Sequence, residues 1–218
     1  MTDIDENQMR EDLVSAYSEV VIDMNLMDQA SGNLSCRVDG GMLISPAGAT
    51  VKNLTPDRVV KVSDDGTWEE GVKPSSEWRM HQAIYQRHDA ANAVVHTHSD
   101  YCVALACHSL PLPGFHYMVG ALGGRDVPCV PYSTFGTEKL ANDAAEALDD
   151  RFACLLAHHG MICRGRDLKT AVIYAERLEI LCRHYWLARQ QGEPGQLTDE
   201  QWDEFFERAK RVVYTKFI

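Results

Sequence analysis

Residues 94–100 read VVHTHSD, an apolar strand-like run that ends in two histidines one residue apart. Side chains alternate between the two faces of a strand, so His96 and His98 are predicted to point to one face and Thr97 to the other. Two imidazoles on one face at a strand end can converge on a single cation. They can equally be two ordinary polar residues at a sheet edge, and the remaining motifs must decide between these interpretations.

A second apolar run also ends in histidine. Residues 153–157 are apolar throughout and predict a buried strand, which His158, His159 and Gly160 follow directly. If the two strands belong to one sheet and run in the same direction, their ends meet. Three imidazoles suit zinc or another late divalent metal, with one position left for an acidic residue or a substrate. Because adjacent residues point apart, one of His158 and His159 is expected to be only a turn residue.

Residues 74–77 read PSSE and mark the start of a helix. Backbone N–H groups at a helix start are unpaired and carry partial positive charge, and the Ser75 and Ser76 hydroxyls add donors, which makes a pocket suited to phosphate. The simpler alternative is a pair of serine caps followed by a glutamate that the helix dipole favours. The loops at 31–33 (SGN) and 46–48 (PAG) can also face an anion, although each is more often only a turn.

The bulk properties favour a globular protein with a small-molecule substrate. The 218 residues suffice for one fairly large domain, and we expect a single domain over residues 1–218. The formal net charge of -11 predicts that neither nucleic acid nor an anionic membrane is a partner. A bound metal ion would supply the local positive charge that an anionic substrate needs.

Three further features predict a cytoplasmic location. The start MTDIDENQMRED has no basic region followed by an apolar core, so it predicts no signal peptide. No run of 18 apolar residues is present, so no membrane span is expected. The seven cysteines are scattered and include no CxxC pair, which is typical neither of a disulfide framework nor of a zinc finger.

Periodicity and turn residues predict interleaved helices and strands. Helices are expected at 7–29, 74–88, 101–107, 137–148, 170–189 and about 199–213, and strands at 34–38, 42–45, 58–62, 93–96, 127–132 and 153–157. Several strand pairs are joined by turns too short for crossover connections. The predicted fold class is therefore α/β, with a central mixed, largely antiparallel sheet sandwiched between helices.

Seven motifs in a fixed order carry a resemblance to a known family. The segments SGNLS, ISPAG, PSSEWRMH, ANAVVHTH, GFHYM, PYSTFGT and LLAHHGM resemble the class II aldolase/adducin family, from about residue 10 to the last helix. The resemblance implies an αβα fold and a homotetramer with active sites between subunits. It also implies a zinc ion, or else cobalt or manganese, with His158 as a neighbour and the ligands Glu77, His96, His98 and His159.

The resemblance also implies where a substrate phosphate binds. The residues that match the family's phosphate site are Gly32, Asn33, Gly48, Ser75 and Ser76. One departure is Ala47, which stands where family members that act on fuculose phosphate have a threonine. The hydroxyl donor is lost there while the backbone N–H remains, so we expect either weaker phosphate binding or compensation by Thr50 or water.

The implied reaction is the retro-aldol cleavage of a ketose 1-phosphate, such as L-fuculose 1-phosphate, to dihydroxyacetone phosphate and an aldehyde. Glu77 would leave the metal when substrate arrives and act as acid and base at C3. Tyr117 matches a tyrosine that reaches the C4 oxygen from a neighbouring subunit, and Tyr214 resembles a second tyrosine at the aldehyde end. Phe135 would line the same pocket. Without the resemblance, Tyr117 and Phe135 would be taken for core residues.

Four other functions remain open within the same family. One is an aldolase for 5-deoxyribulose or 5-methylthioribulose 1-phosphate, with a more apolar aldehyde pocket. A pentulose-5-phosphate 4-epimerase and a sugar-phosphate dehydratase would share the metal chemistry. An adducin-like module that only binds partners is the alternative from another class, but such a protein is expected to lose metal ligands, and all four are intact here.

Overall fold

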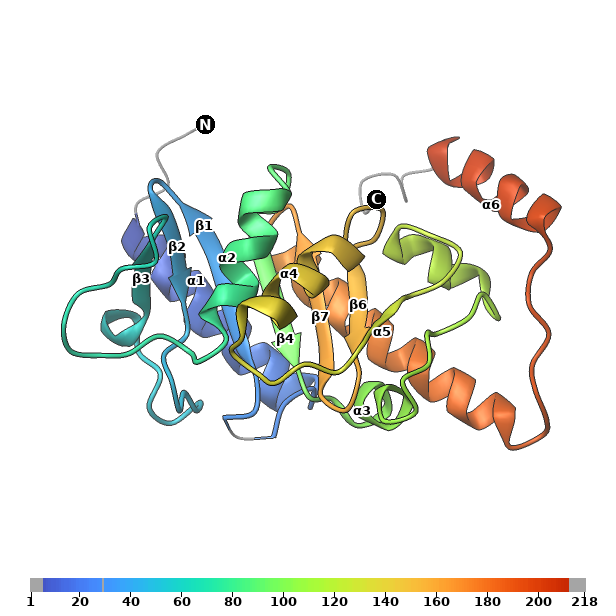
Figure 1. The fold of residues 1–218 in the computed structure, drawn as a ribbon, viewed down its shortest axis with the longest axis horizontal. Coiled ribbons are helices and arrows are strands. Elements are labelled where there is room, and N and C mark those ends of the chain that lie inside the picture. The colour runs from blue at the N-terminus through green and yellow to red at the C-terminus, as the bar shows by residue number, and fades with distance from the viewer. Residues whose placement is uncertain (1–5, 29, 212–218) are drawn as a thin grey trace.

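The computed structural model describes residues 6–28 and 30–211. In chain order (Figure 1), its elements are α1 (Glu6–Ser18), η1 (Glu19–Asp23), β1 (Asn33–Val38), β2 (Gly41–Ile44), η2 (Pro56–Arg58), β3 (Val60–Ser63), α2 (Trp78–Arg87), β4 (Ala93–Thr97), α3 (Asp100–Ala106), η3 (Tyr117–Leu122), β5 (Cys129–Val130), α4 (Glu138–Ala147), β6 (Ala153–Leu156), β7 (Gly160–Gly165), α5 (Leu168–Arg189) and α6 (Asp199–Arg211).

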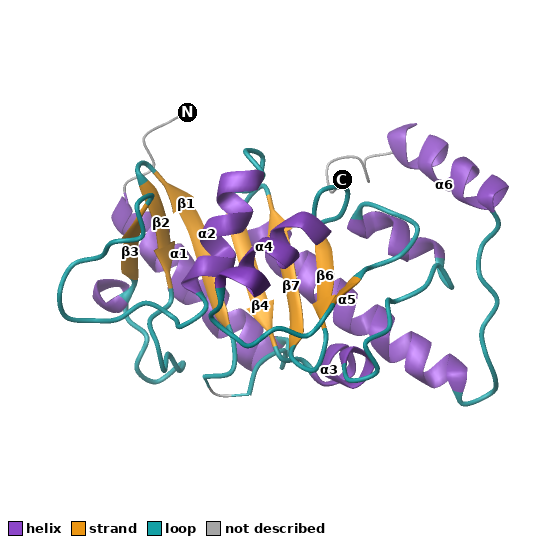
Figure 2. Ribbon diagram, in the orientation of Figure 1, coloured by secondary structure: helices purple, strands orange, loops and turns teal. Residues whose placement is uncertain are grey.

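The strands form one sheet, coloured orange in Figure 2, in the order β3-β2-β1-β4-β7-β6-β5. Neighbouring strands are antiparallel throughout the described sheet, apart from the parallel pair β5–β6. The predicted mixed, largely antiparallel sheet is confirmed. Short hairpins such as the one at Gly40 and Gly41 explain it, because a tight turn can join only antiparallel strands.

Each face of the sheet carries its own apolar core. Val94 packs in one core with Ile84 of α2 and Ala144 of α4. Its neighbour Val95 packs in the other core with Leu178 of α5. Figure 1 shows α2 and α4 in front of the sheet and α1 and α5 behind it. The predicted sandwich is confirmed. Side chains of the central strand β4 alternate between the two faces of the sheet, so Val94 and Val95 enter different cores.

Strand β7 was not predicted, yet it sets the direction of its neighbours. It lies between β4 and β6 and is antiparallel to both, with Ile162 opposite His96 and Met161 opposite Leu155. Strands β4 and β6 therefore run in the same direction, as the metal hypothesis required. The short apolar run Met161–Cys163, directly after the turn at His158 and His159, was the available signal for this strand.

Two helix predictions differ from the structure at their ends, since the helix expected from residue 74 begins only at Trp78 and the first helix ends early. The first helix was expected to reach residue 29, but α1 passes into the π-helical turn η1 and ends at Asp23. Asn25 then adopts a left-handed conformation with φ of 52°, which stops the helix. The last helix begins as predicted, because Thr198 accepts a hydrogen bond from Gln201 N–H at 3.3 Å. The end expected near residue 213 lies outside the described residues.

Two predicted strands are shorter, and proline explains both. The strand expected at 127–132 is reduced to β5, since Pro128 and Pro131 flank it and neither has a backbone N–H to donate to a neighbouring strand. The strand expected from residue 58 begins at Val60 because Pro56 opens the short helix η2. Within residues 6–28 and 30–211, no helix is long and apolar enough to cross a bilayer.

Candidate metal and substrate site

Four predicted metal ligands lie together at one end of the sheet. One ligand atom from each of Glu77, His96, His98 and His159 falls within 4.8 Å of all the others. The Nε2 atom of His96 lies 3.0 Å from His98 Nε2 and 3.0 Å from Glu77 Oε2. The three imidazole rings stand edge to face, with centroids 4.9, 4.9 and 4.8 Å apart. The two histidine-bearing strand ends therefore converge on one point.

The fold brings these residues together from three places. His96 lies in β4 and His98 follows it, while Glu77 directly precedes α2. His159 lies in the turn between β6 and β7, where His158 takes the left-handed conformation with φ of 57°. The exposed ring of His158 lies 3.3 Å from the Ser109 hydroxyl. His158 is thus the turn residue of the adjacent pair, and His159 faces the cluster.

Hydrogen bonding and burial prepare the rings as ligands. Nδ1 of His96 donates to the Met161 carbonyl at 2.7 Å, which directs Nε2 toward the cluster. Burial, with the neighbouring His96, lowers the pKa of His98 and of His159 to about 4. Both rings are therefore neutral near pH 7 and offer the lone pairs that metal binding needs.

Glu77 and His96 shift each other's pKa in opposite directions. Burial alone would raise the pKa of Glu77, but the His96 imidazole outweighs burial and keeps the pKa of this carboxyl well below its usual range. Burial likewise acts to lower the pKa of His96, and the Glu77 carboxylate overcomes it and raises that pKa. The site therefore contains an ionised carboxylate among imidazoles.

The donor set fits a late divalent metal. Glu77 Oε1 is buried and accepts no hydrogen bond from the described chain, although His159 Nε2 lies 3.3 Å away. A buried carboxylate oxygen without a partner costs on the order of 1–3 kcal/mol or more. A cation held by Glu77, His96, His98 and His159 would remove this cost, and three imidazoles with one carboxylate are the ligands that zinc and its neighbours prefer.

Three of the predicted phosphate residues lie around the start of α2. Backbone hydrogen bonds from Ser75 N to Ser45 O (3.1 Å) and from Ala47 N to Lys73 O (2.9 Å) tie the PAG loop to the PSSE segment. Gly48 has φ of +67°, and a Cβ there would meet no atom within 4 Å. Gly48, Ser75 and the exposed Ser76 thus share one region. The Ala47 N–H expected to face phosphate is already committed to Lys73, which corrects that expectation.

The other two predicted phosphate residues have additional partners. Asn33 lies opposite His96 in the β1–β4 pairing, and its Nδ2 donates to Glu77 Oε2 at 3.3 Å. Its Oδ1 lies 2.5 Å from Nε2 of His81, a residue that the sequence analysis did not single out. A Cβ on Gly32 would lie 2.6 Å from the His96 carbonyl oxygen, so glycine is needed there for close packing against β4.

Of the three residues expected at the aldehyde end of the substrate, the structure describes two, Phe135 and Tyr117. Phe135 is 64% exposed in the loop between β5 and α4. A Cβ on the next residue, Gly136, would lie 2.9 Å from the Ser76 carbonyl oxygen, so this loop lies against the start of α2. Tyr117 is 49% exposed at the start of η3, and its ring contacts His116 and Phe205. Tyr214 lies outside the described residues.

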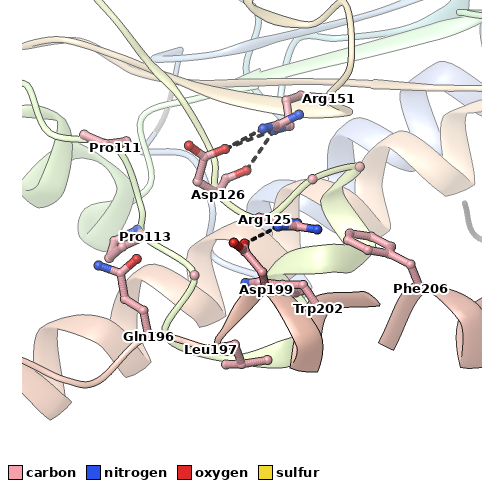
Figure 3. Close-up of a pocket in the computed structure, with 13 residues that line it drawn as sticks. Pro111, Pro113, Arg125, Asp126, Arg151, Gln196, Leu197, Asp199, Trp202 and Phe206 are labelled. Carbon is pink, nitrogen blue, oxygen red and sulfur yellow. Dashed lines mark hydrogen bonds and ion pairs between the residues drawn. The ribbon is translucent and has the colours of Figure 1, made fainter. Parts of the chain in front are cut away.

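A separate hollow of about 670 Å³ lies beside α6 and contains none of the predicted site residues (Figure 3). Its two arginines are both engaged in ion pairs. Arg125 pairs with Asp199 and Asp203 of α6, and Arg151 pairs with Asp126 at 2.6 Å. The hollow thus offers no unpaired arginine to an anion, and the metal cluster is the better candidate for chemistry.

Comparisons with known proteins agree with this geometry. The 5-methylthioribulose-1-phosphate/5-deoxyribulose-1-phosphate aldolase of Rhodospirillum rubrum is 41% identical over 202 residues, covering 93% of this chain and 91% of that protein. The L-fuculose phosphate aldolase of Escherichia coli O6:H1 is 44% identical over 162 residues, which cover 74% of this chain and 75% of that protein. A solved L-fuculose 1-phosphate aldolase superimposes with a TM-score of 0.87 at 35% identity, covering 93% of this chain and 96% of that one. Residues 11–186 match the Class II Aldolase and Adducin N-terminal domain, and the chain belongs to this family.

Proposed function

We propose that this chain is a metal-dependent aldolase that cleaves a ketose 1-phosphate into dihydroxyacetone phosphate and an aldehyde. One observation carries the proposal. Glu77 belongs to the four-residue cluster and also follows directly on Ser75 and Ser76 at the start of α2. A substrate held by its phosphate at this helix start therefore has its next carbon atoms beside the carboxylate and the imidazoles.

Zinc is the proposed metal, with cobalt and manganese as substitutes. A divalent cation held by Glu77, His96, His98 and His159 supplies Lewis-acid stabilisation of the negative charge that develops on the substrate when the C3–C4 bond breaks. The alternative aldolase chemistry uses a buried lysine of lowered pKa. In the described part of the chain no lysine is buried, and the half-buried Lys61 pairs with Glu6 at 2.7 Å, which supports the metal-dependent route.

Glu77 is the proposed acid and base at C3. During cleavage C3 must gain a proton and the C4 hydroxyl must lose one. The ionised Glu77 carboxylate can take up a proton and return it at C3, and its uncompensated Oε1 is the oxygen available for this transfer. At the other end of the bond, Tyr117 from a neighbouring subunit is proposed to contact the C4 oxygen, with Tyr214 close by.

The phosphate is proposed to bind at the start of α2. The helix dipole favours an anion there, and the Ser75 and Ser76 hydroxyls can donate to it. Gly48 is exposed, and there is open space where its Cβ would lie. Holding the phosphate fixes the position of C3 relative to Glu77, so the binding energy of the phosphate orients the C3–C4 bond for cleavage.

The aldehyde pocket and the assembly complete the proposal. The exposed Phe135 is an apolar wall for the aldehyde portion, and it suits either the methyl end of fuculose 1-phosphate or the methylthio group of the relatives' other substrate. Exposed Tyr117 and Phe135 favour a homotetramer with active sites between subunits. All seven cysteines are free thiols, which supports a reducing compartment such as the cytoplasm.

The test is release of dihydroxyacetone phosphate, measured with a coupled dehydrogenase on L-fuculose, 5-methylthioribulose and 5-deoxyribulose 1-phosphates. We expect release from at least one substrate, loss of activity after chelation and recovery with zinc, cobalt or manganese. Epimerisation or dehydration without free dihydroxyacetone phosphate would identify one of the other family activities. Full activity after exhaustive chelation, or no metal uptake at all, would contradict the proposal.

A further inference from the structure

A buried polar chain extends from Glu77 into the protein core. Asn33 joins the Glu77 carboxylate to the ring of His81 in α2. On the far side of the ring, His81 Nδ1 lies 2.7 Å from Ser35 Oγ, which lies 2.7 Å from the Tyr85 hydroxyl. His81 and Ser35 are fully buried, and Asn33 and Tyr85 are 4% and 5% exposed. Buried polar groups of this kind are costly unless each is satisfied.

The direction of each hydrogen bond follows from Glu77. An ionised carboxylate only accepts, so the Asn33 amide must turn its Nδ2 group toward it. Its Oδ1 then faces His81, and Nε2 of His81 must donate. Burial lowers the pKa of His81 to about 3, so the ring is neutral and has a single N–H. Nδ1 therefore accepts from the Ser35 hydroxyl, which in turn accepts from Tyr85.

The opposite arrangement is unfavourable. If His81 accepted at Nε2, the Asn33 amide would rotate and place its carbonyl oxygen against the Glu77 carboxylate. Glu77 Oε2, which also lies 3.0 Å from His96 Nε2, would then lose the Asn33 donor and face a second acceptor in a buried site. The tautomer of His81 and the orientation of Asn33 are thus fixed together.

We propose that His81 is a positioning residue, which locks the Asn33 amide and through it holds the Glu77 carboxylate in the metal site. This inference rests on the proposed function, since it assigns a task to a carboxylate that is both ligand and acid–base group. The simpler alternative is that His81 only satisfies Ser35 and stabilises the packing of α2 on the sheet. The two roles use different nitrogens of the ring, and they can be separated.

Two polar substitutions make the separation. In His81→Gln, the side-chain amide reaches the position of Nε2 and can still donate to Asn33. In His81→Asn, the shorter amide reaches only the position of Nδ1 and keeps the contact with Ser35. Removal of a hydrogen-bond partner behind a metal ligand typically costs about 10–100-fold in metal affinity or activity. We expect this loss in kcat for His81→Asn, with KM changed less than kcat, and only a few-fold loss for His81→Gln.

The second readout requires no substrate. The purified metal-loaded protein is titrated with a chelator, and the zinc retained per chain is measured for wild type and both variants. His81→Asn should release zinc at about tenfold lower chelator concentration, and His81→Gln should stay near wild type. A double variant, Asn33→Ala with His81→Asn, should be no worse than Asn33→Ala alone, because His81 acts through Asn33. Tyr85→Phe controls for loss of a buried hydroxyl and should stay near wild type.

Three outcomes would overturn the inference: equal behaviour of the two His81 variants, wild-type kcat and zinc retention in His81→Asn, or full additivity with Asn33→Ala. Because zinc retention is read without substrate, failure of the proposed function is a separate result. A wild-type protein that retains zinc but releases no dihydroxyacetone phosphate would reject the aldolase proposal, and the zinc titration would still decide the role of His81.

Discussion

Gly160 packs so closely against His98 that a Cβ on residue 160 would lie 2.9 Å from Cδ2 of the His98 ring. The same Cβ would lie 2.4 Å from the Thr97 carbonyl oxygen. The first residue of β7 therefore fits only without a side chain. Because residue 160 has no side chain, β7 can approach β4 closely, and the ring of the candidate metal ligand His98 packs directly against Gly160.

Gly160→Ala is predicted to weaken metal binding although residue 160 offers no ligand. Since the Thr97 carbonyl belongs to the backbone, β4 and β7 must separate and the His98 ring must tilt. Overpacking of this kind typically costs about 1–3 kcal/mol of stability. Zinc per chain and the unfolding midpoint should both fall. Gly195→Ala, where a Cβ meets no atom within 4 Å, is the matched control, and equal zinc content in the two variants would contradict the argument.

Glu77→Gln is predicted to keep the fold and nearly abolish turnover. Glutamine has the same shape and still accepts from the Asn33 amide, but it cannot carry a proton to C3. Loss of a general acid–base group typically lowers kcat about 10²–10⁴-fold. Glu6→Gln, which removes partly exposed ion pairs with Lys61 and Arg10, should stay near the wild-type rate. A normal kcat in Glu77→Gln would remove this carboxylate from the mechanism.

The adjacent histidines provide a matched pair for the metal site. His159→Ala should lose bound zinc and activity together, because it removes one of four ligands. His158→Asn should keep both, since His158 is exposed and asparagine tolerates its left-handed backbone. Zinc analysis and dihydroxyacetone phosphate release on the same samples make the comparison. Zinc loss in His158→Asn with retention in His159→Ala would reverse the assignment.

Ser76→Ala is predicted to raise KM for a phosphorylated substrate by about tenfold, since a hydrogen bond to a charged group contributes about 1.5–3 kcal/mol. Its kcat should change less, because the Ser76 side chain is exposed and makes no hydrogen bond to the metal cluster in the described part of the chain. Ser75→Ala should raise KM as well and also lower stability by about 1 kcal/mol, because the Ser75 hydroxyl accepts from Glu77 N–H at 3.3 Å. An unchanged KM in the double variant would place the phosphate elsewhere.

The protein is predicted to lose stability in mild acid partly through His81. Its folded pKa of about 3 lies below the ordinary value of 6.5, so between these pH values the unfolded chain binds more protons than the folded one. Stability therefore falls as pH falls, by up to about 1.4 kcal/mol per pH unit from this residue. His81→Gln removes this contribution. Urea unfolding at pH 7.5 and 4.5, at equal protein and zinc concentrations, should show a smaller acid loss in the variant, and identical losses would contradict the assignment.

Local pattern was sufficient for most elements and for the placement of histidines at two strand ends, while the family resemblance indicated which residues would be the metal ligands. The apolar face of α5, with Val172, Leu178 and Tyr185, is buried as its periodicity indicated. Because neighbouring side chains diverge, the pattern predicted that one of His158 and His159 is only a turn residue, and the resemblance indicated that it is His158. These features depend on contacts within a few residues, which the order of residues specifies directly.

Features that depend on distant segments escaped prediction. His81 looked like one more polar residue of an amphipathic helix, and its partners Ser35 and Asn33 lie in β1, 46 and 48 residues earlier in the chain. Strand β7 was missed because its apolar run, Met161–Cys163, has only three residues and lies between Gly160 and Arg164, so it resembles a loop. The hydrogen bond from Ala47 N–H to the Lys73 carbonyl could not be predicted either, since every residue except proline has a backbone N–H and the sequence does not indicate its partner.

The sequence by itself determined the alternation that sends His96 and His98 to one face, the caps and breaks of the helices, and the set of side chains able to hold a divalent cation. Only the tertiary structure decided that β7 would lie between β4 and β6, which makes these strands run in the same direction and brings His159 to His96. Only it decided which way the Asn33 amide turns. The physical reason is that strand order and hydrogen-bond direction are set by packing and by the burial of charge between segments far apart in the chain, and no local pattern records either.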